Sequence, residues 1–168
     1  MRSDSLARIL FELTDRLKAL PLTGDRDVDI VTELIEHHKA TIQMDLVLVR
    51  DGDDEKLKEF AERLTAIQEE EIGNMQEFLD HHPSVNGTGK RGKPELATQL
   101  HAMAPTDDVD AAYVSFLRMH LNYGIALARK EHERGLHDDM KQLAGEIVRS
   151  GEKMVAELED VGASVTDR

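Results

Sequence analysis

Apolar residues recur every three or four positions along almost the whole of this 168-residue chain, and this spacing is typical of amphipathic helices. No stretch alternates between apolar and polar residues for long enough to predict a β-strand. The four prolines fall between the periodic segments, where a helix is expected to break. The pattern therefore predicts an all-α chain with six helices, at about residues 3–20, 27–50, 54–81, 94–103, 109–133 and 137–161.

The second half of the chain aligns with the first half, without a gap, when His120 is placed on His37; we call this the repeat alignment. The other pairs that coincide fall in the long predicted helices and in the turns between them: Leu34 and Leu117, Ile42 and Ile125, Gly52 and Gly135, Ala61 and Ala144. We infer an internal duplication, with residues 1–83 and 84–168 as its repeats inside a single helical-bundle domain, residues 1–168. Each repeat is predicted to hold a shorter lead-in helix and a long helical hairpin, and two such hairpins packed together form a four-helix bundle.

Two polar residues lie at the centres of apolar stripes in the first predicted hairpin. His38 lies in the middle of the stripe on residues 27–50, and Glu71 holds a similar place on residues 54–81. In an antiparallel hairpin that turns at Gly52, the two residues differ by roughly 7 Å in height, at about 1.5 Å of rise per residue. A buried carboxylate is unfavourable unless it is paired, hydrogen-bonded or bound to a metal. We therefore predict that His38 and Glu71 face each other and are energetically coupled.

The second repeat replaces both of these residues with apolar ones. In the repeat alignment, His38 corresponds to Leu121 and Glu71 corresponds to Met154. The two residues therefore change together, as parts of one site would. The pattern leaves two interpretations open, which are a site for a metal or another small cation and a purely structural His–Glu pair.

The composition excludes several classes of function. Lys and Arg number 21 and Asp and Glu number 34, so the formal charge is −13 and no basic surface exists to bind nucleic acid. Cysteine is absent, which excludes disulfides, thiolate metal ligands and thiol nucleophiles. No apolar run approaches the roughly 18 residues of a membrane span, so we expect no membrane partner. The charged N-terminal segment is not a secretory signal; we expect a cytoplasmic protein if Met1 is the natural start, and an exported one if a signal has been removed.

The runs "HHKATIQM" and "AERLTAIQEEEIGNMQEFL" resemble the bacterial domain-of-unknown-function 305 (DUF305) family. Its hallmark is His-His-x-x-Ala-Ile-x-Met, followed by a block that contains Gln-x-x-Glu-Ile-x-x-Met. The positions that match are His37, His38, Ile42, Met44, Ala61, Gln68, Glu71, Ile72 and Met75. The resemblance implies a ferritin-like four-helix bundle and, because some members are linked to copper binding and tolerance, copper or another transition metal as ligand. The candidate metal ligands are then His37, His38, Met44, Gln68, Glu71 and Met75.

Two functions therefore stay open. One is a small non-enzymatic protein that binds or buffers a copper-like metal at these residues. The alternative is a metal-free helical interaction or dimerisation module, in which the same residues specify packing or a homodimer interface. We expect no enzyme activity, because a di-iron carboxylate site needs Glu-x-x-His pairs on two helices, whereas Glu33 and His37 are four positions apart.

The remaining polar features are predicted to be structural. The other histidines are expected to face a helix C-terminal dipole or to lie in solvent: His81, His82, His101, His132 and His137. Residues 83–93 are rich in Gly, Asn, Lys and Arg, and this composition predicts an exposed connector between the two hairpins.

Overall fold

The structure is a computed structural model that describes residues 4–84, 87, 89, 91–92, 95–103 and 106–166. It is all helical, and the six predicted helices are confirmed: α1 (Asp4–Ala19), α2 (Arg26–Asp51), α3 (Glu55–His81), α4 (Glu95–His101), α5 (Val109–Arg134) and α6 (Asp138–Thr166). Within the described residues there is no strand beyond an isolated bridge between Leu22 and Gly89. In the same part of the chain, no helix combines the length and the apolar character needed to cross a membrane.

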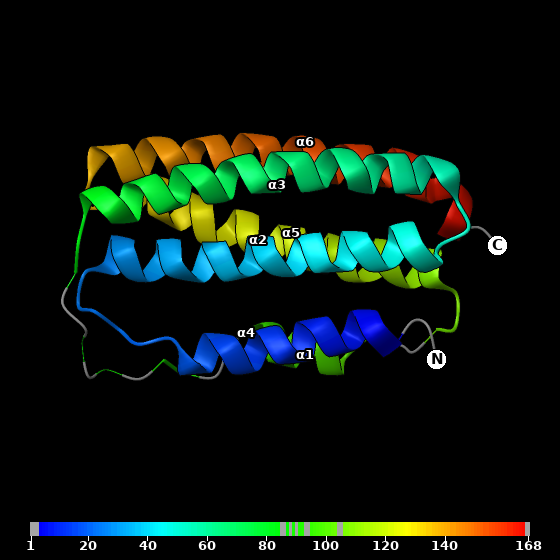
Figure 1. The fold of residues 1–168 in the computed structure, drawn as a ribbon, viewed down its shortest axis with the longest axis horizontal. Coiled ribbons are helices and arrows are strands. Elements are labelled where there is room, and N and C mark those ends of the chain that lie inside the picture. The colour runs from blue at the N-terminus through cyan, green and yellow to red at the C-terminus, as the bar shows by residue number, and fades with distance from the viewer. Residues whose placement is uncertain are drawn as a thin grey trace.

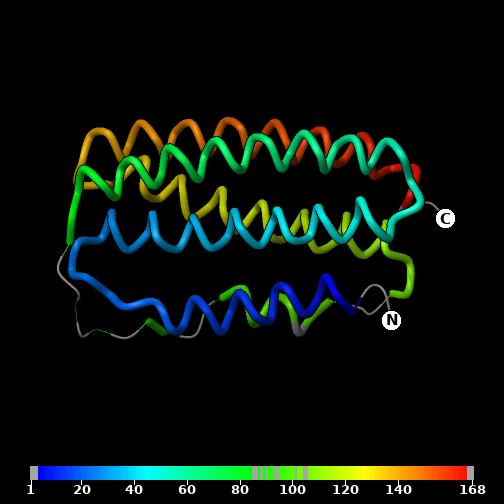
Figure 2. The backbone as a smooth tube through the Cα atoms, in the orientation of Figure 1, coloured from blue at the N-terminus to red at the C-terminus, as the bar shows by residue number. Residues whose placement is uncertain are grey.

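The helices form three layers of two, and the four long helices make up two adjacent layers (Figure 1). α3 and α6 lie side by side in one layer, and α2 and α5 lie side by side in the next. Because α2 also contacts α3 and α5 also contacts α6, the four long helices enclose one core. α1 and α4 form the third layer against α2 and α5, and the tube in Figure 2 shows each short helix leading into a hairpin.

Local sequence signals fix where the long helices begin and turn. Asp25, Asp54 and Asp108 each accept hydrogen bonds from backbone amides in the first turn of α2, α3 and α5 respectively. These caps satisfy amides that have no partner inside the helix. A Cβ atom at Gly52 or at Gly135 would lie 2.7 Å from a carbonyl oxygen of the preceding helix, so only glycine fits the two hairpin turns.

Two buried aspartates tie the hairpins together at opposite ends of the bundle. Asp27, in the first turn of α2, accepts hydrogen bonds of 3.0 and 2.7 Å from the amides of residues 136 and 137 in the α5–α6 turn. Asp110, in the first turn of α5, accepts hydrogen bonds of 3.0 Å from each of the amides of residues 53 and 54 in the α2–α3 turn. Each hairpin therefore holds the turn of the other, and the contacts join positions that are equivalent in the repeat alignment.

A polar layer divides the apolar core into two clusters. The larger cluster extends from the α2–α3 turn to Leu64 and includes the apolar faces of α1 and α4. The smaller cluster fills the opposite end, from Val28 on α2 to Phe78 on α3. Between the clusters lie the buried polar side chains that we call the polar layer: His37, His38, Thr41, Gln68, Glu71 and His120.

The prediction of an exposed connector holds for residues that are exposed in the structure, namely Pro83, Ser84, Gly89 and Gly92. It is wrong for Arg91. Its guanidinium donates to Glu33 Oε2 (2.8 Å) and to the carbonyl oxygen of Asp29 (2.7 Å), and its side chain is only 11% exposed. The carbonyl oxygen of Gly89 accepts a hydrogen bond from the amide of Leu22. Residues 85, 86, 88, 90 and 93 of that predicted connector lie outside the described residues.

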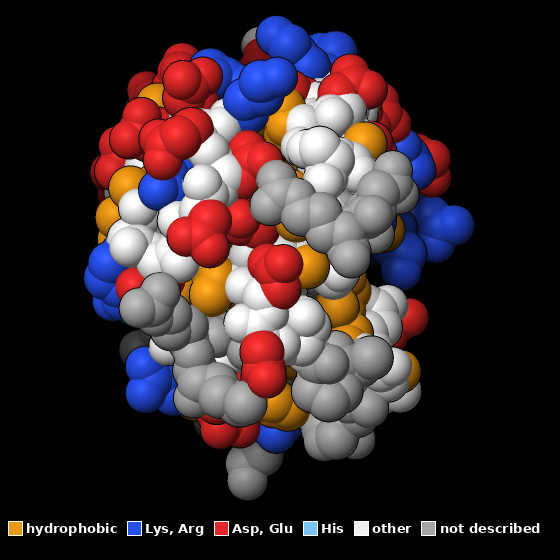
Figure 3. Space-filling model, turned by 90° about the vertical axis from the view of Figure 1, so that its right-hand side faces the viewer, with side chains coloured by type: hydrophobic (Ala, Val, Ile, Leu, Met, Phe, Trp, Pro, Cys, Tyr) orange, Lys and Arg blue, Asp and Glu red, His pale blue; other side chains and the backbone are white. Residues whose placement is uncertain are grey.

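The acidic balance of the sequence is visible at the end of the bundle that carries the α2–α3 turn. Figure 3 views this end and shows acidic side chains spread over much of its surface. The turns that meet there supply several of them: Asp51, Asp53, Asp54, Asp107 and Asp108. This end therefore contrasts with the opposite end, where histidines accompany the aspartates.

A second buried carboxylate lies outside the polar layer, in the larger apolar cluster. Asp45 is 1% exposed, and it accepts hydrogen bonds from the hydroxyls of Tyr113 (2.6 Å) and Thr65 (2.9 Å). Burial raises the pKa of Asp45 to about 7, although both hydrogen bonds oppose the rise. The pKa of this carboxyl group is higher in the folded state than in the unfolded state. Its contribution to the free energy of unfolding is therefore fully present below about pH 4 and is lost as the pH rises through 7.

We expect Asp45→Asn to remove this pH dependence, because the amide can keep the hydrogen bond from Tyr113 and carries no charge. The gain in the free energy of unfolding over the wild type should grow between pH 4 and pH 7.5, to on the order of 3 kcal/mol. Urea denaturation at a series of pH values measures this gain. A difference between the two proteins that is constant across this range would contradict the raised pKa.

The two aspartates that each cap the turn of the other hairpin, Asp27 and Asp110, can be tested with a matched pair of variants. We expect Asp27→Ala and Asp110→Ala each to lower the free energy of unfolding by about 2–4 kcal/mol, because each leaves two amides without their charged acceptor. Circular dichroism during urea denaturation measures the loss, and Asp107→Ala, at an exposed position, serves as the control. A loss below about 0.5 kcal/mol at either buried aspartate, as is usual for surface changes, would show that the cap is dispensable.

Candidate metal centre

The histidine and the carboxylate at the centre of the first hairpin meet inside the polar layer. His38 Nε2 lies 2.7 Å from Glu71 Oε2, and the two residues are 5% and 9% exposed. The prediction that they face each other is confirmed. α2 and α3 contact each other along their length. The two side chains are long enough to span the difference in height between His38 and Glu71 along the hairpin.

The tautomer of His38 follows from its second contact. His38 Nδ1 lies 2.9 Å from the carbonyl oxygen of Leu34, which can only accept, so Nδ1 carries a proton. In the neutral imidazole, Nε2 then holds a lone pair directed at Glu71. The 2.7 Å contact therefore contains one proton shared between the ring and the carboxylate. A metal cation can take the place of such a proton, because it binds the same lone pairs.

Two further side chains orient the carboxylate of Glu71. Gln68 Nε2 donates to Oε2 at 3.3 Å, and the Ser150 hydroxyl on α6 donates to Oε1 through a short hydrogen bond. Gln68 was a candidate ligand, and in the structure its amide group lies beside the carboxylate of Glu71. Ser150 was missed, because no pattern marks it: in the repeat alignment it corresponds to Ile67 on an apolar stripe.

A second histidine pair crosses from one hairpin to the other. The rings of His37 and His120 stack with centroids 4.8 Å apart, and their Nδ1 atoms lie 3.4 Å apart. His120 Nε2 donates to the carbonyl oxygen of His37 (2.9 Å), so the Nδ1 atom of His120 accepts a proton from that of His37. This arrangement leaves His37 Nε2 buried, unprotonated and without a hydrogen-bond partner.

Both of these histidines are held neutral at physiological pH. Burial lowers the pKa of His120 to about 4, although its hydrogen bond to the His37 carbonyl opposes the shift. Burial, with the nearby imidazoles of His120 and His38, lowers the pKa of His37 well below its usual value. The neutral imidazole is the form that binds metal ions.

A cavity of about 30 Å³ lies in the polar layer. Its walls include three imidazoles and one carboxylate, from His37, His38, His120 and Glu71. A volume of roughly 10–15 Å³ already holds one water molecule, so this cavity can hold a single water or a single ion. On the α5 and α6 side the wall is apolar and glycine-rich: Leu121, Gly124, Ile125, Ile147 and Gly151.

The remaining candidate ligands lie away from the cavity. Met44 is fully buried in the larger apolar cluster, and Met75 is fully buried in the smaller one. The polar layer separates the two thioethers, and neither contributes to the wall of the cavity. The structure therefore brings His37, His38, Gln68 and Glu71 together and leaves both methionines in the core on either side.

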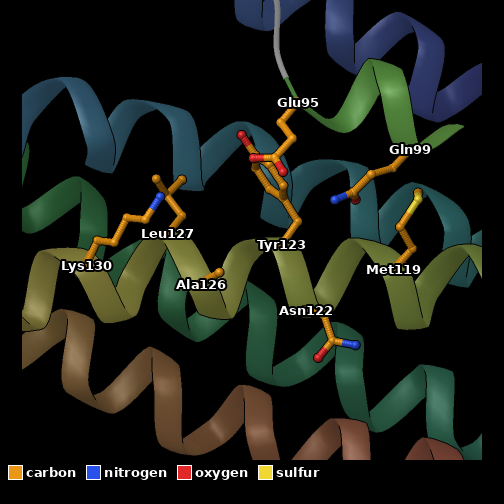
Figure 4. Close-up of a pocket in the computed structure, with 8 residues that line it drawn as sticks. All are labelled: Glu95, Gln99, Met119, Asn122, Tyr123, Ala126, Leu127 and Lys130. Carbon is orange, nitrogen blue, oxygen red and sulfur yellow. The ribbon is translucent and has the colours of Figure 1, made fainter.

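A larger groove of about 410 Å³ lies outside this layer, along α5 and beside the start of α4 (Figure 4). Tyr123 rises from α5 in the middle of the groove. Its ring stacks on His37 with centroids 4.8 Å apart, and its hydroxyl donates to Glu33 Oε1 at 3.3 Å. Tyr123 thus separates the buried histidines from the open groove.

The coupling of His38 and Glu71 can be measured with a double-mutant cycle. We expect His38→Leu alone to lower the free energy of unfolding by about 2–4 kcal/mol, because it leaves Glu71 buried without its main partner. The combination of His38→Leu with Glu71→Met should recover much of this loss, because it reproduces the pair Leu121 and Met154 of the second repeat. Additive losses in urea denaturation would show that the two residues act independently.

Comparison with known proteins places the chain in a family. No curated protein matches it. Solved structures that match it include CopM in the Cu(II)-bound form, with a TM-score of 0.65, 16% identity, and coverage of 82% of this chain and 96% of that one. CopM in the Cu(I)-bound form matches with a TM-score of 0.63, 18% identity, and coverage of 80% and 93%. At these identities the likeness shows a shared helical fold.

A match to a sequence family is more specific than the likeness in fold. The sequence model described as "Domain of unknown function (DUF305)" matches residues 27–161, which span the four long helices almost completely. The resemblance drawn from the two histidine- and methionine-containing runs is thereby confirmed. The chain belongs to the DUF305 family.

Proposed function

We propose that this chain is a non-enzymatic protein that binds one transition-metal ion of the copper type in the cavity of the polar layer. The observation that carries the proposal is a cavity for one ion, lined by three imidazoles and a carboxylate at the centre of an otherwise apolar bundle. Buried polar groups are unfavourable unless they are satisfied. The second repeat has Leu121 and Met154 in place of His38 and Glu71, so apolar residues fit the equivalent positions. Binding of a ligand would explain why the first repeat has polar residues instead.

The residues around the cavity supply nitrogen and oxygen donors for such an ion. The ion would have to draw them closer, because among the described residues that line the cavity no three His and Glu ligand atoms lie within 4.8 Å of one another. His37 Nε2 is a buried nitrogen that has a lone pair and no hydrogen-bond partner. His38 and Glu71 share a proton that a cation can replace, and Gln68 and Ser150 hold the carboxylate in place. Imidazole and carboxylate ligands suit copper and zinc. Bound there, the ion would supply the positive charge that balances Glu71.

The position of the methionines bears on which ion is preferred. Thioether ligands favour Cu(I), and both Met44 and Met75 lie in the apolar clusters, away from the cavity wall. The nitrogen and oxygen donors of the cavity therefore favour a divalent ion such as Cu(II). The matching CopM structures include Cu(I)-, Cu(II)- and Ag-bound forms and an apo form, and their shared fold supports a metal as the class of ligand.

Tyr123 lies on one route from solvent to His37. It forms a wall of the open groove on one side and stacks on His37 on the other. Rotation of this side chain would connect the groove to the polar layer. Its hydrogen bond to Glu33, which also binds Arg91, holds the ring in the closed position.

One observation favours the alternative, a metal-free interaction or dimerisation module. The contacts among His38, Glu71, Gln68 and Ser150 already satisfy one another without an ion. Two large apolar side chains, Leu46 and Leu136, are also mostly exposed, and a second copy of the chain could cover them. In this alternative the polar layer specifies which helices pack together.

The finer description of the fold belongs to the same proposal. We propose that the bundle is ferritin-like and arose by duplication of a lead-in helix and a hairpin. The reciprocal contacts of Asp27 and Asp110, which join equivalent positions of the two repeats, support the duplication. Superposition of residues 26–81 on residues 109–164 tests it.

The proposed function predicts a metal-dependent stability that the polar layer confers. Elemental analysis of the protein, purified without an affinity tag, should find copper, and Cu²⁺ at a hundred times its Kd should stabilise the fold by about 2.7 kcal/mol. The His38→Leu/Glu71→Met chain should fold but lose this copper-dependent stabilisation, whereas His132→Ser, at an exposed histidine, should keep it. Equal responses of the wild type and the double variant would support the metal-free alternative.

A further inference from the structure

A second group of metal-ligating side chains lies at the end of the bundle where the α5–α6 turn meets the start of α2, on the left of Figure 1. Among the described residues, Asp25, Asp27 and His137 each bring a ligand atom within 4.8 Å of the others. The sequence predicted that His137 lies in solvent and that His82 faces a helix dipole. Both rings instead pack against carboxylates at this end.

The ring of His137 is oriented as metal-binding imidazoles usually are. Its Nδ1–H donates to Asp27 Oδ2 at 2.8 Å, so in the neutral ring the Nε2 atom presents a lone pair on the opposite edge. The hydrogen bond with Asp27 and the nearby carboxylates of Asp25 and Asp139 raise the pKa of this imidazole, so a metal ion would compete with a proton there. That Nε2 atom lies 3.9 Å from Asp25 Oδ2. Two ligands that bind a tetrahedral ion at about 2.1 Å lie about 3.4 Å apart. A shift of about 0.5 Å would therefore let one ion bridge His137 and Asp25.

His82 lies beside this group without belonging to it, since among the described residues only the three members of the group bring ligand atoms within 4.8 Å of one another. The ring of His82 would have to rotate to become a third donor. Its ring centroid lies 4.2 Å from that of His137, and both rings rest on the phenyl ring of Phe78. Its Nε2–H donates to Asp139 Oδ2 at 2.7 Å, which leaves Nδ1 as the nitrogen with a lone pair. Each imidazole thus has its own carboxylate to fix its orientation, a pattern typical of histidine metal ligands.

The opposite end of the bundle shows that the histidines are not needed for the fold. There Asp110 caps the α2–α3 turn as Asp27 caps the α5–α6 turn, and the residue at the place of His137 is Asp54. Asp54 caps α3 through the amide of Leu57. The ring of His137 forms a hydrogen bond with Asp27 and does not cap α6. Aspartate is a better N-cap residue than histidine, so the second hairpin has the less favourable residue at this position.

The contrast extends to the two other residues of this end. In the repeat alignment, His82 corresponds to Val165 and Asp139 corresponds to Lys56. The second imidazole and its carboxylate are therefore also absent from the opposite end. The residues found at this end alone are His82, His137 and Asp139. Each of them can bind a metal ion or can orient a side chain that binds one.

We propose that Asp25, His82 and His137 form a second metal site, for a divalent cation that prefers nitrogen and oxygen ligands, such as Zn²⁺. Asp27 and Asp139 orient the two imidazoles. The three ligands come from the start of α2, the end of α3 and the α5–α6 turn, so a bound ion links both hairpins. The side chains are 24–31% exposed at the three ligand positions, which gives the ion direct access from solvent. This site is independent of the cavity in the polar layer.

Isothermal titration calorimetry of the full chain with ZnCl₂, without an affinity tag, tests the proposal. The His38→Leu/Glu71→Met chain should still bind a Zn²⁺ ion, which separates this site from the polar layer. His137→Ser should lower the affinity for that ion at least about tenfold, and Asp139→Asn should lower it about 10–100-fold through loss of orientation. His132→Ser should leave it unchanged.

Serine is a favourable helix cap, so His137→Ser is expected to fold as well as the wild type; circular dichroism checks this. NMR should also show the imidazole signals of His82 and His137 shifting together on addition of Zn²⁺. The proposal is overturned if the wild type binds no Zn²⁺, or if His137→Ser binds it as tightly as the wild type. It is equally overturned if the polar-layer double variant abolishes the binding that depends on His137.

Discussion

The exchange of caps between the hairpins sets the geometry of the whole bundle. Asp27 and Asp110 each bind the two amides of the opposite turn, at opposite ends of the molecule. Each is followed, ten residues later on its own helix, by His37 or His120, which is roughly 15 Å of helix. Because α2 and α5 are antiparallel and anchored at both ends, these histidines are brought to the same level near the middle. The contact between His37 and His120 is thus a consequence of the hydrogen bonds that Asp27 and Asp110 form at the two ends of the bundle.

The polar layer is the feature of this interior that packing alone does not explain. Apolar clusters fill both ends of the bundle, and a continuous apolar core would join them without the desolvation of imidazoles and a carboxylate. The polar side chains are organised instead of scattered: Glu71 receives three hydrogen-bonding partners, and His37 keeps one nitrogen free. An interior built in this way favours one arrangement of the helices, and it is the feature on which the proposed metal site rests.

The sequence predicted most of the fold because its signals are local. Prolines, capping aspartates and turn glycines mark the helix ends, and apolar stripes place His38 against Glu71 once the turn is known. Contacts between hairpins could not be predicted in this way, since nothing in the periodicity of one helix records the helix that it meets. Ser150 was missed for this reason. Met44 and Met75 entered the candidate site because a family motif records spacing along a helix, and spacing does not reveal which cluster a side chain enters.

The glycines on the far wall of the cavity have a consequence for how such a centre can be assembled. Gly124 and Gly151 occupy the places that correspond to Thr41 and Gln68 of the first hairpin. Two identical hairpins would bring both threonines and both glutamines toward the same volume, and a strictly symmetric homodimer has no means of shrinking one side only. Joining the hairpins in one chain removes that restriction. One half can then carry most of the polar groups while the other contributes His120, Ser150 and the glycines that leave room for them.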